Sequence, residues 1–188
     1  MNWKIRSLIS VFMLFTTLTL FAAEDAPASL QKLAPVLKEW AANPILVNAV
    51  KAHNAQGLSL DDIKAKDEVW IKDSGISAFM KNIMENDAAK ELARLERTQG
   101  YFFECFLMGN QGANVAMTNK TSDYWQGDED KWSESFKNGV GAVFFSKVKF
   151  DDSAQAYLVQ ISVPVMDGGK AIGVITIGVN LDDYEASL

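Results

Sequence analysis

The residues best suited to chemistry lie in one polar and aromatic block, which reads TSDYWQGDE over residues 121–129. Two neighbouring rings stand there among carboxylates, hydroxyls and a carboxamide. Aromatic faces attract cations through their quadrupole and carboxylates add charge pairing, so the block suits a small ligand with a positive charge. The candidate ligand-binding residues are Ser122, Asp123, Tyr124, Trp125, Asp128, Trp132 and Tyr157.

The same block also has a purely structural interpretation. Tyr124 and Trp125 could form an apolar plug instead of the wall of a pocket. Acidic side chains are favourable in the first turn of a solvated helix, because they face the positive end of the helix dipole. This second interpretation is favoured for Glu129 and Asp130, while both remain open for the two rings.

Residues for catalysis are scarce. The single histidine, His53, is predicted near a helix end with a surface or capping role, and the single cysteine, Cys105, lies in an apolar strand as an inert thiol. A hydrolase using Ser122 and Asp123 lacks a well-placed base, and no G-x-S-x-G motif is present. The acidic run from Asp123 to Asp130 lacks the ligand spacing of a calcium-binding loop. We therefore expect no enzyme activity, no metal and no cofactor.

Composition sets the class of protein. The chain has 188 residues with 24 acidic and 18 basic side chains, a net charge of −6, and 48% of its residues are hydrophobic. This is typical of a folded domain. An acidic chain is a poor match for phosphates, which argues against nucleic acid. One cysteine excludes an internal disulfide.

The N-terminus resembles a leader. Lys4 and Arg6 precede an uncharged apolar run over residues 8–23, which predicts a signal peptide cleaved after Ala22 and a periplasmic location. The alternative is an uncleaved segment that anchors the protein in a membrane. The predicted organisation is a signal peptide over 1–22, a helical region over 23–100 and a sheet with its pocket loop over 101–188.

Apolar spacing predicts helices first. Leucines and Trp40 recur every three or four residues over 29–53, with a kink at Pro44. Ser59 followed by Asp62 indicates a helix over 60–72. A third helix is expected from Ser77 to about residue 99, with one long apolar stripe.

Strands follow in the second half. The expected strands cover residues 101–108, 113–117, 142–150, 155–165 and 170–180, with a short helix over 128–137. Asp167, Gly168 and Gly169 predict a hairpin turn. Strands without alternating long helices favour an antiparallel sheet, so the fold class is α+β, with long N-terminal helices packed on a five-stranded antiparallel PAS-like sheet.

Residues 104–179 resemble the Cache (PAS-like, PDC) family of extracellular sensor domains. The resemblance is carried by the turn over 109–112, the TSDYWQGDE block with Lys131 and Trp132, and the hairpin from Val163 to Val174. The resemblance implies a single-Cache domain that binds a small metabolite and does not catalyse a reaction. Because the last expected strand ends close to Leu188, the protein is expected to stand alone and to signal through a membrane receptor or kinase partner.

The resemblance departs from amino-acid-binding members at two positions. Ser122 stands where they carry an arginine for the ligand carboxylate, and Gly178 where they carry an aspartate for the ligand amine. Lys120 and Lys131 are the nearby cations. We therefore expect an amine or a neutral ligand. The alternative function is an interaction module with a collapsed pocket, docking on a membrane receptor or on a second copy through the N-terminal helices as a homodimer.

Overall fold

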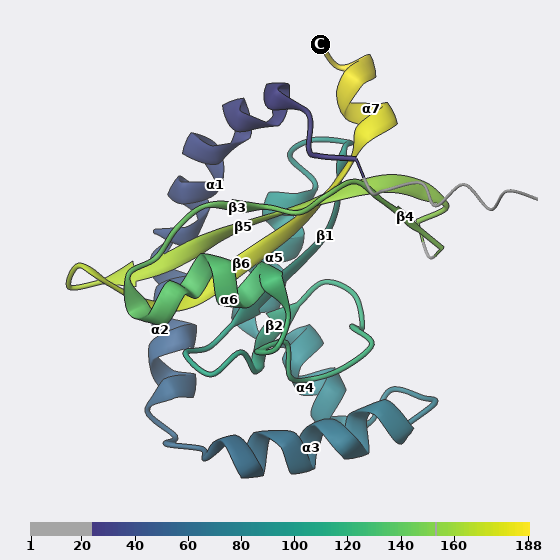
Figure 1. The fold of residues 1–188 in the computed structure, drawn as a ribbon. Helices are drawn as coiled ribbons and strands as arrows, with labels where there is room; N and C mark the ends of the chain where they lie inside the picture. Colours follow the sequence, from purple (N-terminus) through teal and green to yellow (C-terminus); the bar gives the residue numbers. More distant parts are fainter. Residues whose placement is uncertain (1–23, 153) are drawn as a thin grey trace, which may run out of the picture.

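The computed structural model describes residues 24–152 and 154–188, so the predicted signal peptide lies outside the described residues. Helices dominate the first half and strands the second (Figure 1). The helices are η1 (Ala28–Leu33), α1 (Ala34–Ala41), α2 (Pro44–Asn54), α3 (Leu60–Lys72), α4 (Ala78–Glu85), α5 (Asp87–Glu96), α6 (Asp130–Phe136), η2 (Lys137–Gly139) and α7 (Leu181–Ala186). The strands are β1 (Phe102–Met108), β2 (Asn114–Met117), β3 (Phe144–Phe145), β4 (Lys149–Asp151), β5 (Ala156–Asp167) and β6 (Lys170–Asn180).

Local sequence signals explain where the first helices begin. Asn43 caps α2 by accepting the Ile45 N–H at 2.9 Å, and Pro44 occupies the first helical position. The predicted kink is therefore a break between α1 and α2. Ser59 and Asp62 form a reciprocal capping box at the start of α3, which spans the predicted range.

The prediction of a single third helix is wrong, because the chain forms two helices there, α4 and α5. The chain breaks at Asn86, whose Oδ1 accepts the Ala89 N–H at 2.9 Å and starts α5. The Asn86 Nδ2 donates to the Val115 carbonyl of β2 at 2.9 Å. This second bond ties the break to the sheet, so tertiary contact and a capping preference together override the continuous apolar stripe.

The sheet is antiparallel, with strand order β2-β1-β6-β5-β3 and with β4 also paired to β5. In the part of the chain described it has six strands, which corrects the expected five. The single strand predicted over 142–150 is split because Ser146 Oγ accepts the Gln160 N–H at 2.8 Å, while the Val148 N–H donates to the Glu24 carbonyl at 2.8 Å. The Ser146 side chain thus replaces a backbone acceptor in the pairing with β5, and the bond from Val148 to Glu24 draws the chain away from β5 before β4.

The longest pairing joins β5 and β6 through the predicted hairpin. Gly168 and Gly169 have φ values of 57° and 80°, a left-handed conformation that glycine adopts without strain. Along β5, Val159, Ile161 and Val163 alternate into the core as expected, whereas Tyr157 is 53% exposed. Tyr157 therefore lies outside the buried stripe.

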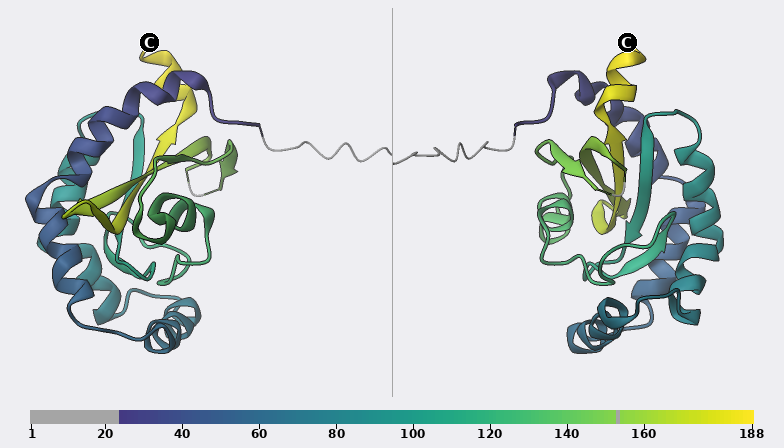
Figure 2. Two further views of the ribbon diagram at one scale, coloured as in Figure 1. Left: turned by 60° about the vertical axis from the view of Figure 1, so that its left-hand side comes forward. Right: turned by 90° about the vertical axis from the view of Figure 1, so that its right-hand side faces the viewer.

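Two apolar clusters lie on opposite faces of the sheet. On the inner face, α1 and α2 pack over the valines and isoleucines of β5 and β6, and α5 packs over β1 and β2. On the outer face, α6 lies across β5 and β6, as both views of Figure 2 show. A second cluster joins Phe106, Met108 and Val174 to Tyr124 and to side chains of α3 and α4. In the described residues no helix is both long and apolar enough to cross a membrane.

Candidate functional site

The loop over residues 118–129 and helix α6 form a cover over the outer face of the sheet (Figure 1). Two indoles fix the cover to the turn between β1 and β2. The Trp125 Nε1–H donates to the Gln111 carbonyl at 2.8 Å, and the Trp132 Nε1–H donates to the Gly109 carbonyl at 3.0 Å. The cover is thus a positioned element and not a free loop, because buried indole donors normally hold one partner.

Between the cover and the sheet lies a polar cluster made of Glu104, Glu129, Lys131 and Gln160. Gln160 Nε2 of β5 donates to Glu104 Oε1 of β1 at 3.1 Å. From α6, the Lys131 ammonium approaches Glu129 to 2.8 Å and lies 5.1 Å from the centroid of the Phe106 ring. The Lys131 side chain is only 11% exposed, so little water solvates its charge. The Glu129 carboxylate and the Phe106 ring stabilise that charge instead.

Burial sets the electrostatics of this cluster. Desolvation raises the pKa of Glu104 above its ordinary value, and the charges of Asp151 and Glu129 act in the same direction. The hydrogen bond from Gln160 and the charge of Lys131 oppose that rise. Burial also raises the pKa of Asp123, which accepts a hydrogen bond from the Gln126 amide. The site therefore holds carboxylates that would gain from a further cationic partner.

A hollow of about 550 Å³ opens beside the cluster. Its lining includes Phe144, Ser146 and Gln160 from the sheet side and Asp128, Glu129 and Lys131 from the cover. Lys147 and Lys149 stand at its rim together with Asp25, and the Lys147 ammonium is 3.9 Å from Asp25. A volume of this size fits a small metabolite.

The predicted site residues do not gather in one place. Asp128 lines the hollow, and Asp123 lies half-buried within the cover. Ser122 is exposed and donates to Asp123 at 3.2 Å. Trp125 and Trp132 are half-buried anchors of the cover, and Tyr157 packs its exposed ring on Phe150 with 5.3 Å between centroids. Their roles in ligand binding remain predictions.

Tyr124 is placed away from the hollow under α6. Its ring is 1% exposed and lies 5.8 Å from Trp70 and 5.1 Å from Phe79, centroid to centroid. Asp67 Oδ1 of α3 accepts the N–H groups of Tyr124 and Trp125 at 2.7 and 3.0 Å. Tyr124 therefore connects the cover to α3 and faces a second cavity on the helical side of the molecule.

Sequence reasoning missed Glu104 and Gln160 and assigned Lys131 no contact. One signal was available, because Glu104 is a charged residue inside the apolar strand FFECFLM. A buried charge in such a strand needs a partner and often marks a functional site. The neighbouring thiol, Cys105, is fully buried, and burial raises its pKa well above the ordinary value, as expected of an inert cysteine.

An antiparallel sheet with helices on one face and a ligand-sized hollow under a cover on the other defines the class of α+β sensor domains. Residues 75–185 match the family described as the first PDC sensor domain of methyl-accepting chemotaxis protein-like proteins. The chain belongs to this family. The resemblance to Cache (PDC) domains is thus confirmed.

Several solved structures are similar to part of the chain. The ligand-binding domain of the Campylobacter jejuni chemoreceptor Tlp3, in complex with 4-methylisoleucine, is 16% identical with a TM-score of 0.43, over 84% of this chain and 61% of that one. The Pseudomonas aeruginosa chemoreceptor PctC, in complex with GABA, is 14% identical with a TM-score of 0.41, over 68% and 59%. An extracellular ligand-binding receptor from Desulfohalobium retbaense is 15% identical with a TM-score of 0.41, over 76% and 26%.

The chain thus spans about three fifths of the two chemoreceptor domains. No curated protein matches it.

Proposed function

We propose that the protein is an exported, periplasmic sensor domain that binds a small amine between the cover and the outer face of the sheet. One observation carries this proposal. A Cβ atom added at Gly178 would lie 2.9 Å from Glu104 Cγ and 3.6 Å from Glu104 Oε1. The Glu104 carboxylate thus occupies the space above Gly178, the position at which amino-acid-binding members of the family are expected to carry an aspartate.

An acid on β1, Glu104, can pair with a ligand amine in the same way as an aspartate on β6 would. Glu104 Oε1 holds one hydrogen bond, from Gln160, which leaves acceptor capacity on the carboxylate. The Phe106 ring, two residues further along the same strand, already faces the Lys131 ammonium at 5.1 Å, so the Glu104 carboxylate is the group left for an amine. Lys131 is already paired with Glu129, so it is a poor clamp for a ligand carboxylate. A primary or secondary amine fits this arrangement better than a zwitterion does.

A thermal-shift screen of matched amines, carboxylates and neutral alcohols of equal chain length tests the proposal. An amine at one hundred times its dissociation constant should stabilise the protein by about 2.7 kcal/mol. Glu104→Gln should abolish that shift, whereas Glu134→Gln, on the exposed side of α6, should preserve it. The proposal fails if no amine shifts the melting temperature, or if Glu104→Gln binds amines as the wild type does.

The signal is proposed to pass to a membrane receptor or kinase partner, with a homodimer through the N-terminal helices as the form that docks. Val36 of α1 is 43% exposed, which leaves an apolar side chain on the outside of this layer. Crosslinking of the exported protein at these helices, with and without amine, tests the idea. A partner that is captured equally in both conditions favours the alternative function, an interaction module that needs no ligand.

A further inference from the structure

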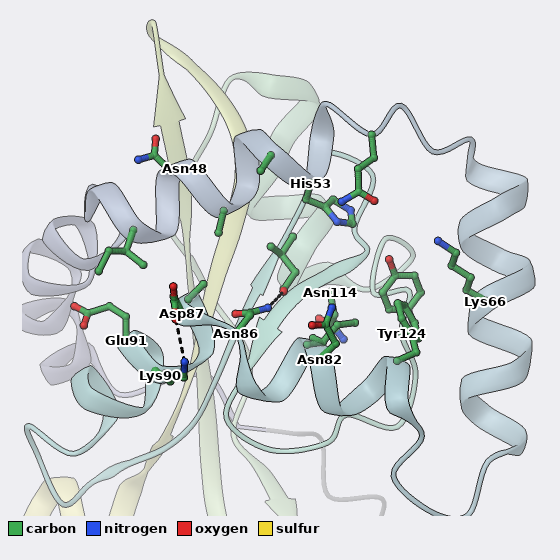
Figure 3. A pocket seen from close by; sticks show the side chains of 18 of the residues that line it. Asn48, His53, Lys66, Asn82, Asn86, Asp87, Lys90, Glu91, Asn114 and Tyr124 are labelled. Atoms are coloured by element: carbon green, nitrogen blue, oxygen red, sulfur yellow. Dashed lines mark hydrogen bonds and ion pairs between the residues drawn. The ribbon is translucent and has the colours of Figure 1, made fainter.

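A large hollow in the described part of the chain lies on the helical side, away from the cover. It has a volume of about 920 Å³ and is lined by α2, α4, α5 and β2, with α3 at its mouth. Figure 3 shows its lining side chains. No residue of this lining also lines the hollow beside the polar cluster. The helical cavity is therefore a separate place, and a ligand bound there would not depend on the proposed amine site.

Apolar groups form much of the wall. Ala49 and Ala52 face it from α2, Ile83 from α4 and Val115 from β2, and the Phe79 ring lies beside Tyr124. Such walls suit an apolar body, and the polar groups among them then decide which ligand is accepted.

Asn114 is the first of these polar groups, and it is 1% exposed. Its Nδ2 donates to Thr121 Oγ1 at 2.9 Å and to the Asp123 carbonyl at 3.2 Å, which fixes the orientation of the carboxamide. Its Oδ1 is buried and accepts no hydrogen bond within the described residues. A buried acceptor without a donor is costly, so this wall of the cavity lacks one donor that a ligand could supply.

Tyr124 and Lys66 supply the opposite chemistry. Burial raises the pKa of Tyr124 to about 12, so its hydroxyl remains a donor at neutral pH. The Lys66 ammonium lies 5.7 Å from the Phe79 centroid and, among the residues described, has no carboxylate within 4.0 Å. In Figure 3 the Lys66 side chain extends from α3 toward Tyr124 across the mouth of the cavity. A cation and a hydroxyl donor thus face the same space.

The other charges around the cavity are already neutralised. Lys90 pairs with Asp87 at 3.0 Å, and Arg94 pairs with Glu91 at 2.7 Å. Burial and the charge of Lys66 lower the pKa of His53 below its ordinary value of 6.5. Its imidazole is therefore uncharged at neutral pH. Asp62, one turn before Lys66 on α3, attracts the ammonium from beyond ion-pair distance. An anion entering the cavity would therefore meet Lys66 as its counter-charge.

We propose that this helical cavity binds a small carboxylate with an apolar body and one O–H or N–H donor. Lys66 and the Tyr124 hydroxyl take the carboxylate, and Asn114 Oδ1 accepts the ligand donor. The alanine, isoleucine and valine side chains contact the body of the ligand. The arrangement prefers a hydroxy or amino acid over the plain acid, because the plain acid would leave Asn114 Oδ1 without a donor.

Calorimetric titration with three hydroxy acids, lactate, 2-hydroxy-4-methylpentanoate and mandelate, tests this proposal. Each is compared with the acid that lacks the hydroxyl and with the alcohol that lacks the carboxylate. We expect at least one hydroxy acid to bind, and both of its analogues to bind at least about tenfold more weakly. Lys66→Gln and Tyr124→Phe should each weaken binding by a similar factor, while Lys64→Gln on the same helix should not.

The single histidine of the chain gives a local readout by NMR. A carboxylate bound beside Lys66 should raise the pKa of His53, because a nearby anion favours the imidazolium. Glu104→Gln should leave this response intact, which separates the helical cavity from the amine site. The proposal is overturned if none of the three hydroxy acids binds, if Lys66→Gln and Tyr124→Phe bind as well as the wild type, or if Glu104→Gln removes the His53 response.

Discussion

At the scale of single residues, Glu104 has two roles with opposite effects. As a half-buried carboxylate it destabilises the fold at neutral pH, and as an acceptor for an amine it would serve the proposed function. Its folded-state pKa is raised above the ordinary value of 4.5 by burial. The folded protein therefore takes up a proton more readily than the unfolded chain, and the resulting stability is lost as the pH rises through the folded-state pKa.

Glu104→Gln should accordingly raise the free energy of unfolding at pH 7, since glutamine keeps the acceptor for Gln160 without the buried charge. The gain should shrink as the pH falls through the folded-state pKa towards 4.5, where glutamate itself is protonated. Urea unfolding over a series of mildly acidic to neutral buffers measures this. A variant less stable than the wild type by the same amount at every pH would show that the carboxylate is structurally required.

At the scale of elements, Asn86 decides that one apolar stripe becomes two helices. Asn86→Ala removes the cap of α5 and the bond to the Val115 carbonyl, so we expect a loss of about 1–2 kcal/mol in unfolding free energy. Asn82→Ala, an exposed position one turn earlier on α4, is the matched control and should change stability by less than about 0.5 kcal/mol. Equal effects of the two substitutions would contradict the assigned role of Asn86.

At the scale of the whole molecule, α3 is attached to the rest of the fold by few buried side chains. Ile63 and Trp70 are the buried residues among its 13, and the Trp70 Nε1–H donates to the Thr121 carbonyl at 2.9 Å. Most of the other side chains of α3 are charged. Stability differs between parts of a fold according to the apolar contacts each part makes. We therefore expect α3 to open locally, independently of the sheet.

Trp70→Ala should release α3 without unfolding β5 and β6. Removing a buried tryptophan costs about 3–5 kcal/mol, which exceeds what the remaining contacts of α3 can offset. Amide hydrogen exchange should become fast in α3 and in the cover residues that Asp67 holds, and should remain slow in the β5–β6 hairpin. Val69→Ala, at a position 67% exposed, is the control. Fast exchange throughout the sheet would show that α3 belongs to one cooperative unit.

Elements that depend on local chemistry could be predicted from the order of residues alone. Ser59 and Asp62 set the start of α3, Pro44 sets the break before α2, and two glycines set the β5–β6 turn. These signals act between residues a few positions apart, so spacing reveals them. The antiparallel α+β fold follows from the order of those elements.

Which side chains share a site could not be predicted in this way, because long-range packing decides it. The Trp125 and Trp132 indoles are committed to backbone carbonyls of a distant turn, and Tyr124 faces the helical cavity. Glu104 meets Gln160 across 56 positions of sequence, and Asn86 meets β2 across 29. Such pairs are set by strand register and helix packing, since contacts between residues far apart in the chain exist only after the sheet and helices have assembled.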